Sequence, residues 1–193
     1  VTRSAVTDGT GAYRIAGISV GAFTGSIAGE GYVPFRFADS AAMGQTIKMD
    51  AALAPIPPVI SAITVADVTF DSARVSWTTD RPADSLVECG ETSAYGSQVA
   101  DATFMTSHGL LLTGLNPSKT YHFRVSSRAA NGAAAVSADG TFNTKAKIGI
   151  TITSPVDGAS ITGTSAMVTG TVTSTANHEM GVTVNGMVAS LTD

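Results

Sequence analysis

The chain has 193 residues, of which 13% are charged, about half of the roughly 25% usual for soluble domains. Lys and Arg number 11 against 15 Asp and Glu, so the positive surplus that nucleic-acid binding needs is missing. No run of about 18 apolar residues occurs, which excludes a membrane-spanning helix. The first residues carry neither an initiating methionine nor a signal-peptide core, and we expect a mature product or a fragment.

Glycine recurs every few residues in the opening stretch TDGTGAYRIAGISVGAFTGSIAGEGY, residues 7–32. A dinucleotide-binding loop requires G-x-G-x-x-G before a helix, but Arg14 stands where the third glycine is needed, and no P-loop motif occurs. Asp8-Gly9 and Thr10-Gly11 are instead typical of tight turns. Alternation then predicts short antiparallel strands through Tyr13 and Ile15, and again through Phe23, Gly25 and Ile27.

This stretch and its continuation GQTIKMDAALAP resemble the carboxypeptidase regulatory-like domain, a small β-sandwich, over residues 1–55. The matched motifs are T-D-x-x-G-x-Y, G-Y and G-Q-T…L-x-P. They are carried by Thr7, Asp8, Gly11 and Tyr13, by Gly31 and Tyr32, and by Gly44, Gln45, Thr46, Leu53 and Pro55. Roughly the first two strands of such a domain are missing, so the resemblance implies an incomplete module with Tyr13 as a structural residue.

The proline-rich residues 54–61, APIPPVIS, predict a short semi-rigid linker because proline lacks an amide donor and restricts the backbone. Beyond it, SARVSWTTD and TYHFRVSS alternate as half-buried antiparallel strands do. The side chains expected to face inward are Ala73, Val75 and Trp77 in the first segment and Tyr121, Phe123 and Val125 in the second.

Leu115, Pro117 and Tyr121 have the spacing of a tyrosine corner, in which the phenol bonds to nearby backbone. With Trp77 they resemble a fibronectin type III domain over residues 56–144, and ADGTFNT resembles its last strand. The resemblance implies that all four residues are structural. It also implies a bacterial subtype with the pattern S-x-V-x-Y-G, in which Cys89 stands in place of the usual tyrosine.

Related modules precede metallophosphatase domains, which makes metal-ligating residue types relevant. His108, His122 and His178 do not have metal-ligand spacing, and we interpret them as solvated strand residues. Cys89 is the single cysteine, which excludes an intrachain disulfide and a zinc cluster of thiolates, and we expect a half-buried thiol on a strand.

Four carboxylates cluster near the turns predicted for the fibronectin-like module: Asp67, Asp71, Asp80 and Asp84. They are compatible with a weak calcium site, or with the ordinary preference of Asp for turns. The motifs G-x-S-x-G, H-E-x-x-H and the EF-hand loop are missing, so we expect no catalytic residues, metal or cofactor.

The end of the chain, residues 145–193, resembles a bacterial Ig-like domain through SPVDGA, VTGTV and VTVNG, and the resemblance implies a module that lacks its last strands. Ile148, Ile150 and Ile152 alternate as strand residues, and Asn185-Gly186 predicts a hairpin turn.

We therefore predict an all-β chain of three tandem antiparallel β-sandwich modules, at 1–55, 56–144 and 145–193, with the first and last incomplete, forming a stiff rod. The favoured function is a non-catalytic extracellular structural or assembly module of a bacterial surface protein or fibre. Its expected partners are other domains of the polypeptide or neighbouring copies, which pair β-strands with the end modules. The alternative is a binding module on a secreted enzyme, with polysaccharide as the partner.

Overall fold

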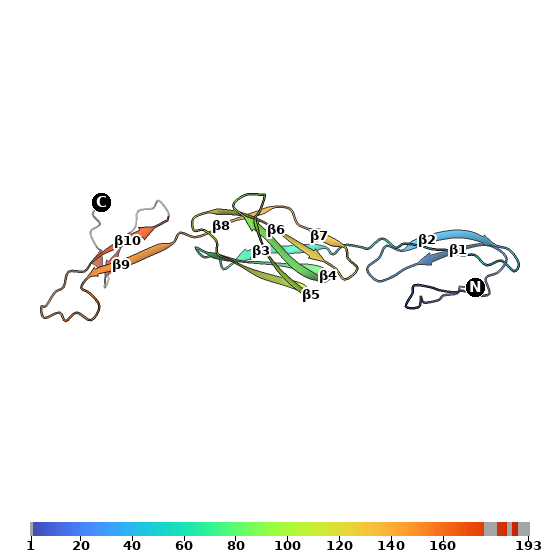
Figure 1. Cartoon of the computed structure of the whole chain (residues 1–193), viewed down its shortest axis with the longest axis horizontal. Helices are drawn as coiled ribbons and strands as arrows, with labels where there is room; N and C mark the ends of the chain where they lie inside the picture. The colour runs from blue at the N-terminus through green and yellow to red at the C-terminus, as the bar shows by residue number, and fades with distance from the viewer. Residues whose placement is uncertain (1, 176–180, 185–186, 189–193) are drawn as a thin grey trace. The chain divides into compact units, whose positions relative to one another are not determined.

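The computed structural model describes residues 2–175, 181–184 and 187–188, and these form strands and loops without a helix. All pairings between the strands are antiparallel, which confirms the predicted fold class. The strands are β1 (Gly21–Ile27), β2 (Phe35–Ala41), β3 (Ile60–Ala66), β4 (Ser72–Gly90), β5 (Ser97–Thr113), β6 (Thr120–Arg128), β7 (Ala134–Val136), β8 (Gly140–Asn143), β9 (Ile148–Ser154), β10 (Thr169–Ser174), β11 (Thr183–Val184) and β12 (Met187–Val188) (Figure 1).

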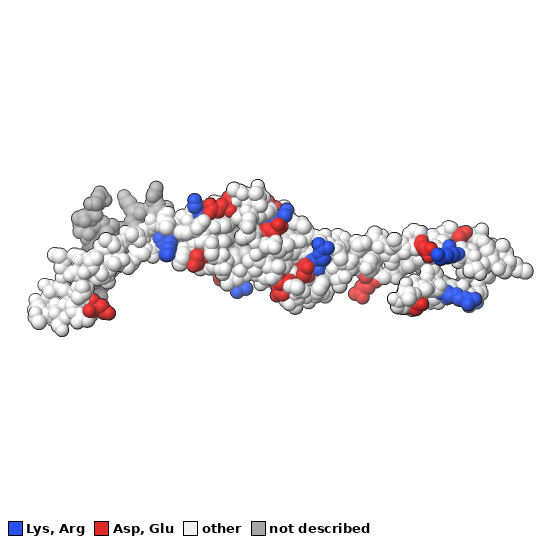
Figure 2. All heavy atoms as spheres, viewed as in Figure 1, with Lys and Arg blue, Asp and Glu red and all other residues white. Residues whose placement is uncertain are grey.

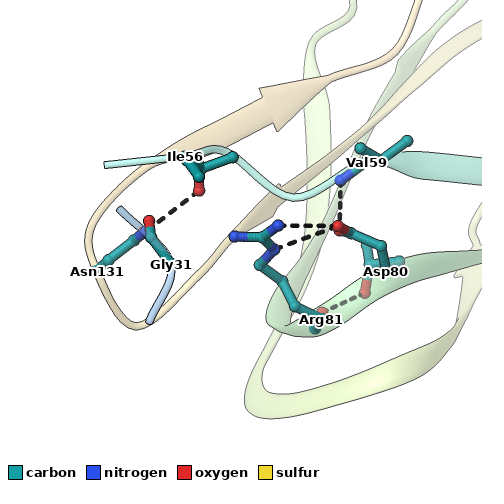
Figure 3. A network of polar contacts seen from close by, with 7 residues as sticks. Gly31, Ile56, Val59, Asp80, Arg81 and Asn131 are labelled. Atoms are coloured by element: carbon teal, nitrogen blue, oxygen red, sulfur yellow. Dashed lines mark hydrogen bonds and ion pairs between the residues drawn. The ribbon is translucent and has the colours of Figure 1, made fainter. Parts of the chain in front are cut away.

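The chain divides into two compact units. Unit 1 comprises Val1–Pro57 with Asn131–Ala133, and unit 2 comprises Pro58–Ala130 with Ala134–Asp193. The array of three modules stays a prediction. Unit 2 begins inside the predicted linker, where the Val59 amide donates to Asp80 Oδ1 at 2.7 Å (Figure 3). The last residues of the proline-rich segment are therefore part of the sandwich.

The long strands β4 and β5 build the sandwich of unit 2 by contributing to both of its layers. The first half of β4 pairs with β3 and with the end of β5. Its second half pairs with the start of β5 and with β6, which also carries β7 and β8. Register shifts between Thr78 and Ser85 separate the two halves. Such irregularities let one strand turn from one layer into the other.

Alternate residues of β4 are buried in both halves, so the strand faces the same core before and after the shift. Trp77 is 1% exposed at the centre of this core, and its Nε1 donates to Ser127 Oγ at 2.9 Å. The other buried core members are Ala73, Val75, Val87, Cys89, Leu110, Leu112, Leu115, Tyr121, Phe123, Val125 and Phe142.

Tyr121 forms the corner that its spacing predicts. The Asn116 backbone N–H donates to Tyr121 Oη at 2.8 Å, and the ring stacks on Phe142 at 5.7 Å between centroids. Leu115 is buried beside it and Pro117 is half-buried in the preceding turn. The bond and the stacking together hold the turn before β6 against the core.

In unit 1, β1 and β2 form a two-stranded sheet after a glycine-containing turn. Asp8 Oδ1 accepts from Thr10 N at 2.8 Å and from Ala12 N at 3.0 Å, and Gly11 has a φ of 83°, so the predicted turn is present. Within the sheet, a β-carbon at Gly25 would lie 2.3 Å from Phe37 Cζ. Glycine is therefore required for this ring to lie flat across the strand.

One strand predicted in unit 1 is wrong. Tyr13 and Ile15 lie in a segment without β-structure, although Tyr13 Oη donates to Met49 O at 3.1 Å. Alternation of apolar and polar residues indicates which side chains would share one face of a strand. A strand forms only where the backbone of a neighbouring segment supplies the hydrogen bonds of a β-ladder. Among the described residues, no strand pairs with this segment. A second polar tie within unit 1 comes from Asn131, whose Nδ2 donates to Gly31 O at 2.6 Å and to Ile56 O at 3.1 Å (Figure 3).

The end of the chain contains the pairs β9–β10 and β11–β12. The alternating isoleucines occupy β9, as predicted. The hairpin turn predicted at Asn185-Gly186 lies outside the described residues, although the flanking strands pair, with Val184 opposite Met187.

Replacing Trp77 with Ala removes the largest side chain of the core of unit 2. We predict that Trp77→Ala lowers the free energy of unfolding of the 193-residue chain by about 3–5 kcal/mol, because packed cores refill large cavities poorly. Chemical denaturation followed by circular dichroism measures this loss. An unchanged midpoint would place the core elsewhere.

Replacing Tyr121 with Phe keeps the ring and deletes only the hydroxyl that accepts from Asn116. We predict a loss of about 1–3 kcal/mol, because a backbone N–H in the turn loses its partner. The same denaturation experiment measures it. Tyr13→Phe, which deletes the hydroxyl of an exposed side chain, serves as the matched control and should leave the transition of unit 2 in place.

Candidate interaction surfaces

The sheet β9–β10 has one apolar face that the described residues leave exposed. Register places Ile150 opposite Val172, and it puts Ile148 and Ile152 on the same face. The three isoleucines are 61%, 65% and 62% exposed. We call Ile148, Ile150, Ile152 and Val172 the isoleucine face. The opposite face carries the threonines of the same strands, Thr151, Thr153, Thr171 and Thr173.

Exposure of this face is energetically costly for so small a sheet. Burying an isoleucine side chain fully stabilises by about 1.5–3 kcal/mol, so covering the exposed part of each contributes about 1–2 kcal/mol. A two-stranded sheet is only marginally stable on its own. The isoleucine face is therefore a surface that gains stability when another layer covers it.

Unit 1 contains a second apolar face, on the sheet β1–β2. Register places Ile27 opposite Phe35 and Gly25 opposite Phe37. The rings of Phe35 and Phe37 lie 6.3 Å apart between centroids, and Phe23 meets Phe37 edge-on at the same distance. Phe35 stays 40% exposed.

Among the described strands, β1, β2, β9 and β10 each have a single neighbour, so each offers an edge for a further strand. Strand pairing at the end modules stays a prediction.

A polar cluster lies on the outward side of β4 and β6 in unit 2. Arg124 of β6 donates from Nε to Glu88 of β4, and its Cζ lies 4.8 Å from the centroid of the Tyr95 ring. Tyr95 Oη donates to Asp139 Oδ1 at 3.0 Å. His122 Nδ1 lies 2.7 Å from the other oxygen of Asp139. These five side chains therefore form one connected network.

Gly90 at the end of β4 allows Tyr95 to reach this network. A β-carbon at Gly90 would lie 2.2 Å from the backbone oxygen of Tyr95, a contact that no other residue type can make. Tyr95 has a φ of 58°, in the left-handed region that a non-glycine residue adopts at a cost. The close approach and the unusual φ together fold the loop after β4 back under Arg124.

Hydrogen bonds within the cluster favour the ionised form of its two carboxylates, Glu88 and Asp139. The hydrogen bond from His122 and, secondarily, that from Tyr95 lower the pKa of Asp139. The bond from Arg124 lowers the pKa of Glu88, and desolvation raises the pKa of the Tyr95 phenol. Beside the cluster is a shallow depression of about 360 Å³, lined by Glu88, Ala94, Tyr95, Gly96, Ser97 and Gln98. It offers hydrogen-bonding groups to a polar ligand.

His108 corrects the expectation of solvated strand histidines. It lies on β5 opposite Trp77, is 3% exposed, and stacks on the indole at 4.9 Å between centroids. Its ring nitrogens contact Thr79 and Ser85 of β4. The alternation of His108 with the buried Leu110 and Leu112 was the sequence signal that could have placed it in the core. His122, by contrast, is half-buried on the outward side of β6, and His178 lies outside the described residues.

The structure does not bring the four candidate calcium ligands together. Each carboxylate has a partner of its own. Asp67 Oδ2 lies 3.8 Å from Arg74 Nε, and Asp71 Oδ1 accepts a hydrogen bond from the Thr69 hydroxyl. Asp84 Oδ1 accepts from the backbone N–H of Arg128. Asp80 bonds to Val59 and Arg81, which lowers its pKa, mainly through the Arg81 bond (Figure 3). Among the described residues, no group of three or more His, Cys, Asp or Glu side chains could hold a metal ion.

Cys89 is more deeply buried than predicted, because it belongs to the core of unit 2, and its Sγ lies 3.2 Å from Ser97 Oγ.

On the face shown in Figure 2, charged side chains are sparse and groups of opposite sign lie beside one another, without a broad basic surface. In the part of the chain that the structure describes, no helix is long and apolar enough to cross a membrane.

Residues 58–144, less than half of the chain, match the family model described as "Purple acid Phosphatase, N-terminal domain". No curated protein matches the chain. Similar solved structures include a computationally redesigned β-sandwich protein, with 27% identity over 46% of this chain and 94% of that one, at a TM-score of 0.36.

Two natural domains are also similar in structure. The sensor domain of the anti-sigma factor RsgI4 from Pseudobacteroides cellulosolvens has 21% identity over 46% of this chain and 95% of that one, at a TM-score of 0.33. A fibronectin type III domain from the human KIAA0970 protein has 18% identity over 45% and 72%, at a TM-score of 0.36. Residues 58–144 of this chain are thus similar to a phosphatase N-terminal domain, within a chain whose fold is an all-β sandwich.

Proposed function

We propose that this chain is a non-catalytic structural and assembly segment of a bacterial extracellular protein, and that its end sheets dock onto neighbouring copies. The observation that carries the proposal is the isoleucine face, where three isoleucines stay more than half exposed on a two-stranded sheet. Soluble domains rarely leave such a contiguous apolar surface without a partner.

Two further features support an assembly role. The apolar side chains of β1–β2 and β9–β10 follow the alternation of sheets that pack face to face in a sandwich. The four strands also offer backbone edges for strand addition. The low charge and the content of glycine and small residues suit an extracellular structural protein, whereas an enzyme needs a site of converging reactive groups.

The second candidate function is a binding module beside a secreted enzyme, with polysaccharide as ligand. The depression next to Tyr95 favours it, because its amide, hydroxyl and carboxylate groups could bond to sugar hydroxyls. Affinity electrophoresis in polysaccharide gels separates the two functions. Retardation that is lost in Tyr95→Ala would favour the binding module.

Assembly between copies predicts that the 193-residue chain increases in mass with concentration, as measured by multi-angle light scattering. Ile150→Asp should weaken this association by about tenfold or more, because a carboxylate would enter the covered face. The matched control is Thr151→Asp, which places the same charge on the opposite face of β9. A constant monomeric mass, with slow amide exchange in both end sheets, would contradict the proposal.

A non-catalytic role predicts that the purified chain contains no stoichiometric zinc or iron by elemental analysis and does not hydrolyse phosphate monoesters. The reason is that, among the described residues, no three or more His, Cys, Asp or Glu side chains form a group that could hold a metal ion. Stoichiometric metal that disappears in His108→Ala or His122→Ala would overturn this expectation.

A further inference from the structure

His108 joins the two halves of β4 across the register shift where that strand changes layers. Its Nε2 lies 2.9 Å from Thr79 Oγ1, just after the first half, and its Nδ1 lies 2.7 Å from Ser85 Oγ, at the start of the second half. The imidazole of His108 therefore contacts both halves of β4, on either side of the point where the strand changes layers. Neither the proposed assembly nor the polar cluster uses this buried group.

The surrounding hydrogen bonds determine which ring nitrogen carries the proton. Thr79 Oγ1 lies 2.8 Å from the carbonyl oxygen of Arg81, which can only accept, so the single hydroxyl proton of Thr79 is directed there. Toward His108, Thr79 can then only accept, and Nε2 must carry a proton. In the neutral ring Nδ1 is the acceptor, and the hydroxyl of Ser85 donates to it.

A second proton on His108 would disturb this arrangement. With a proton on Nδ1, the bond to Ser85 would have to reverse: the Ser85 oxygen would accept from Nδ1, and the hydroxyl hydrogen of Ser85 would lose the acceptor that it has in the neutral state. The charge would lie in a ring that is 3% exposed and without a carboxylate acceptor on either nitrogen. Desolvation accordingly lowers the pKa of His108.

The groups around the ring oppose this effect only in part. The carboxylate of Asp84, on β4, favours the protonated form from a distance, and the Trp77 indole face attracts a cation. From β6, the hydroxyl of Ser127 bonds to Trp77 and carries no charge. Arg81 on β4 directs its guanidinium to Asp80.

We propose that His108 is an acid-sensitive latch of unit 2: its protonation at Nδ1 reverses the bond to Ser85 and places a buried charge at the crossover of β4 and β5, which loosens the crossover. The expected pH dependence follows from linkage. The unfolded chain binds the proton with a pKa of about 6.5, and the folded chain binds it more weakly. Stability is therefore complete above about pH 6.5 and decreases as the pH falls below that value toward the folded pKa.

Urea unfolding of the 193-residue chain between pH 8 and about pH 5, where few carboxylates titrate, tests the latch. The unfolding equilibrium constant of the natural chain should rise by up to about tenfold per pH unit below pH 6.5. In His108→Gln, which cannot take up a proton, this rise should disappear. His122→Gln is the matched control and should keep it. Equal pH dependence in the natural chain and in His108→Gln would overturn the proposal.

If His108→Gln does not fold, NMR of the natural chain tests the same proposal. Nitrogen-15 NMR of the histidine rings distinguishes the tautomers and follows each titration. We expect a neutral His108 that carries its proton on Nε2 and takes up a second proton only below pH 6.5. A neutral ring protonated on Nδ1, or a titration at the unperturbed value, would refute the latch.

Discussion

The crossing of β4 from one layer to the other is the constraint on which unit 2 depends. A straight strand of this length would leave one layer without its central member. The register shifts between Thr78 and Ser85 instead turn the strand so that Trp77 and Val87 line the same core from opposite layers. Because β5 pairs along both halves, it must bend at the corresponding point. The packing of the core is thus coupled to the geometry of one short segment.

At the register shift of β4, polar side chains supply hydrogen bonds that the interrupted β-ladder does not. A bulge leaves backbone and side-chain groups without ladder partners, and each buried one must find another. Thr79, Ser85 and His108 satisfy one another there, with the Arg81 carbonyl as the outermost acceptor. An apolar residue in place of His108 would fill the space under Trp77, but it would leave the buried hydroxyl of Ser85 without its acceptor, whereas Thr79 would keep its bond to the Arg81 carbonyl.

The sandwich of unit 2 could largely be predicted from sequence, because its signals are local. Trp77 and Tyr121 lie within alternating runs, and Leu115 and Pro117 have a spacing tied to one turn geometry. The segment around Tyr13 has similar alternation without a ladder, since pairing depends on a distant backbone. The burial of His108 follows from its register with Leu110 and Leu112, whereas the polarity of its side chain alone favours a solvated position. For the isoleucine face, alternation predicts sidedness, but the covering layer depends on residues far from β9.

The chain contains a single tryptophan, and Trp77 is sealed in the core of unit 2. Its emission under selective excitation therefore comes from one place only. Loss of structure in β1–β2 would leave the tryptophan emission unchanged, as would any change on the isoleucine face. A tryptophan introduced at Phe35 or at Ile152 would give each end its own reporter, and docking could then be watched separately from unfolding of the sandwich.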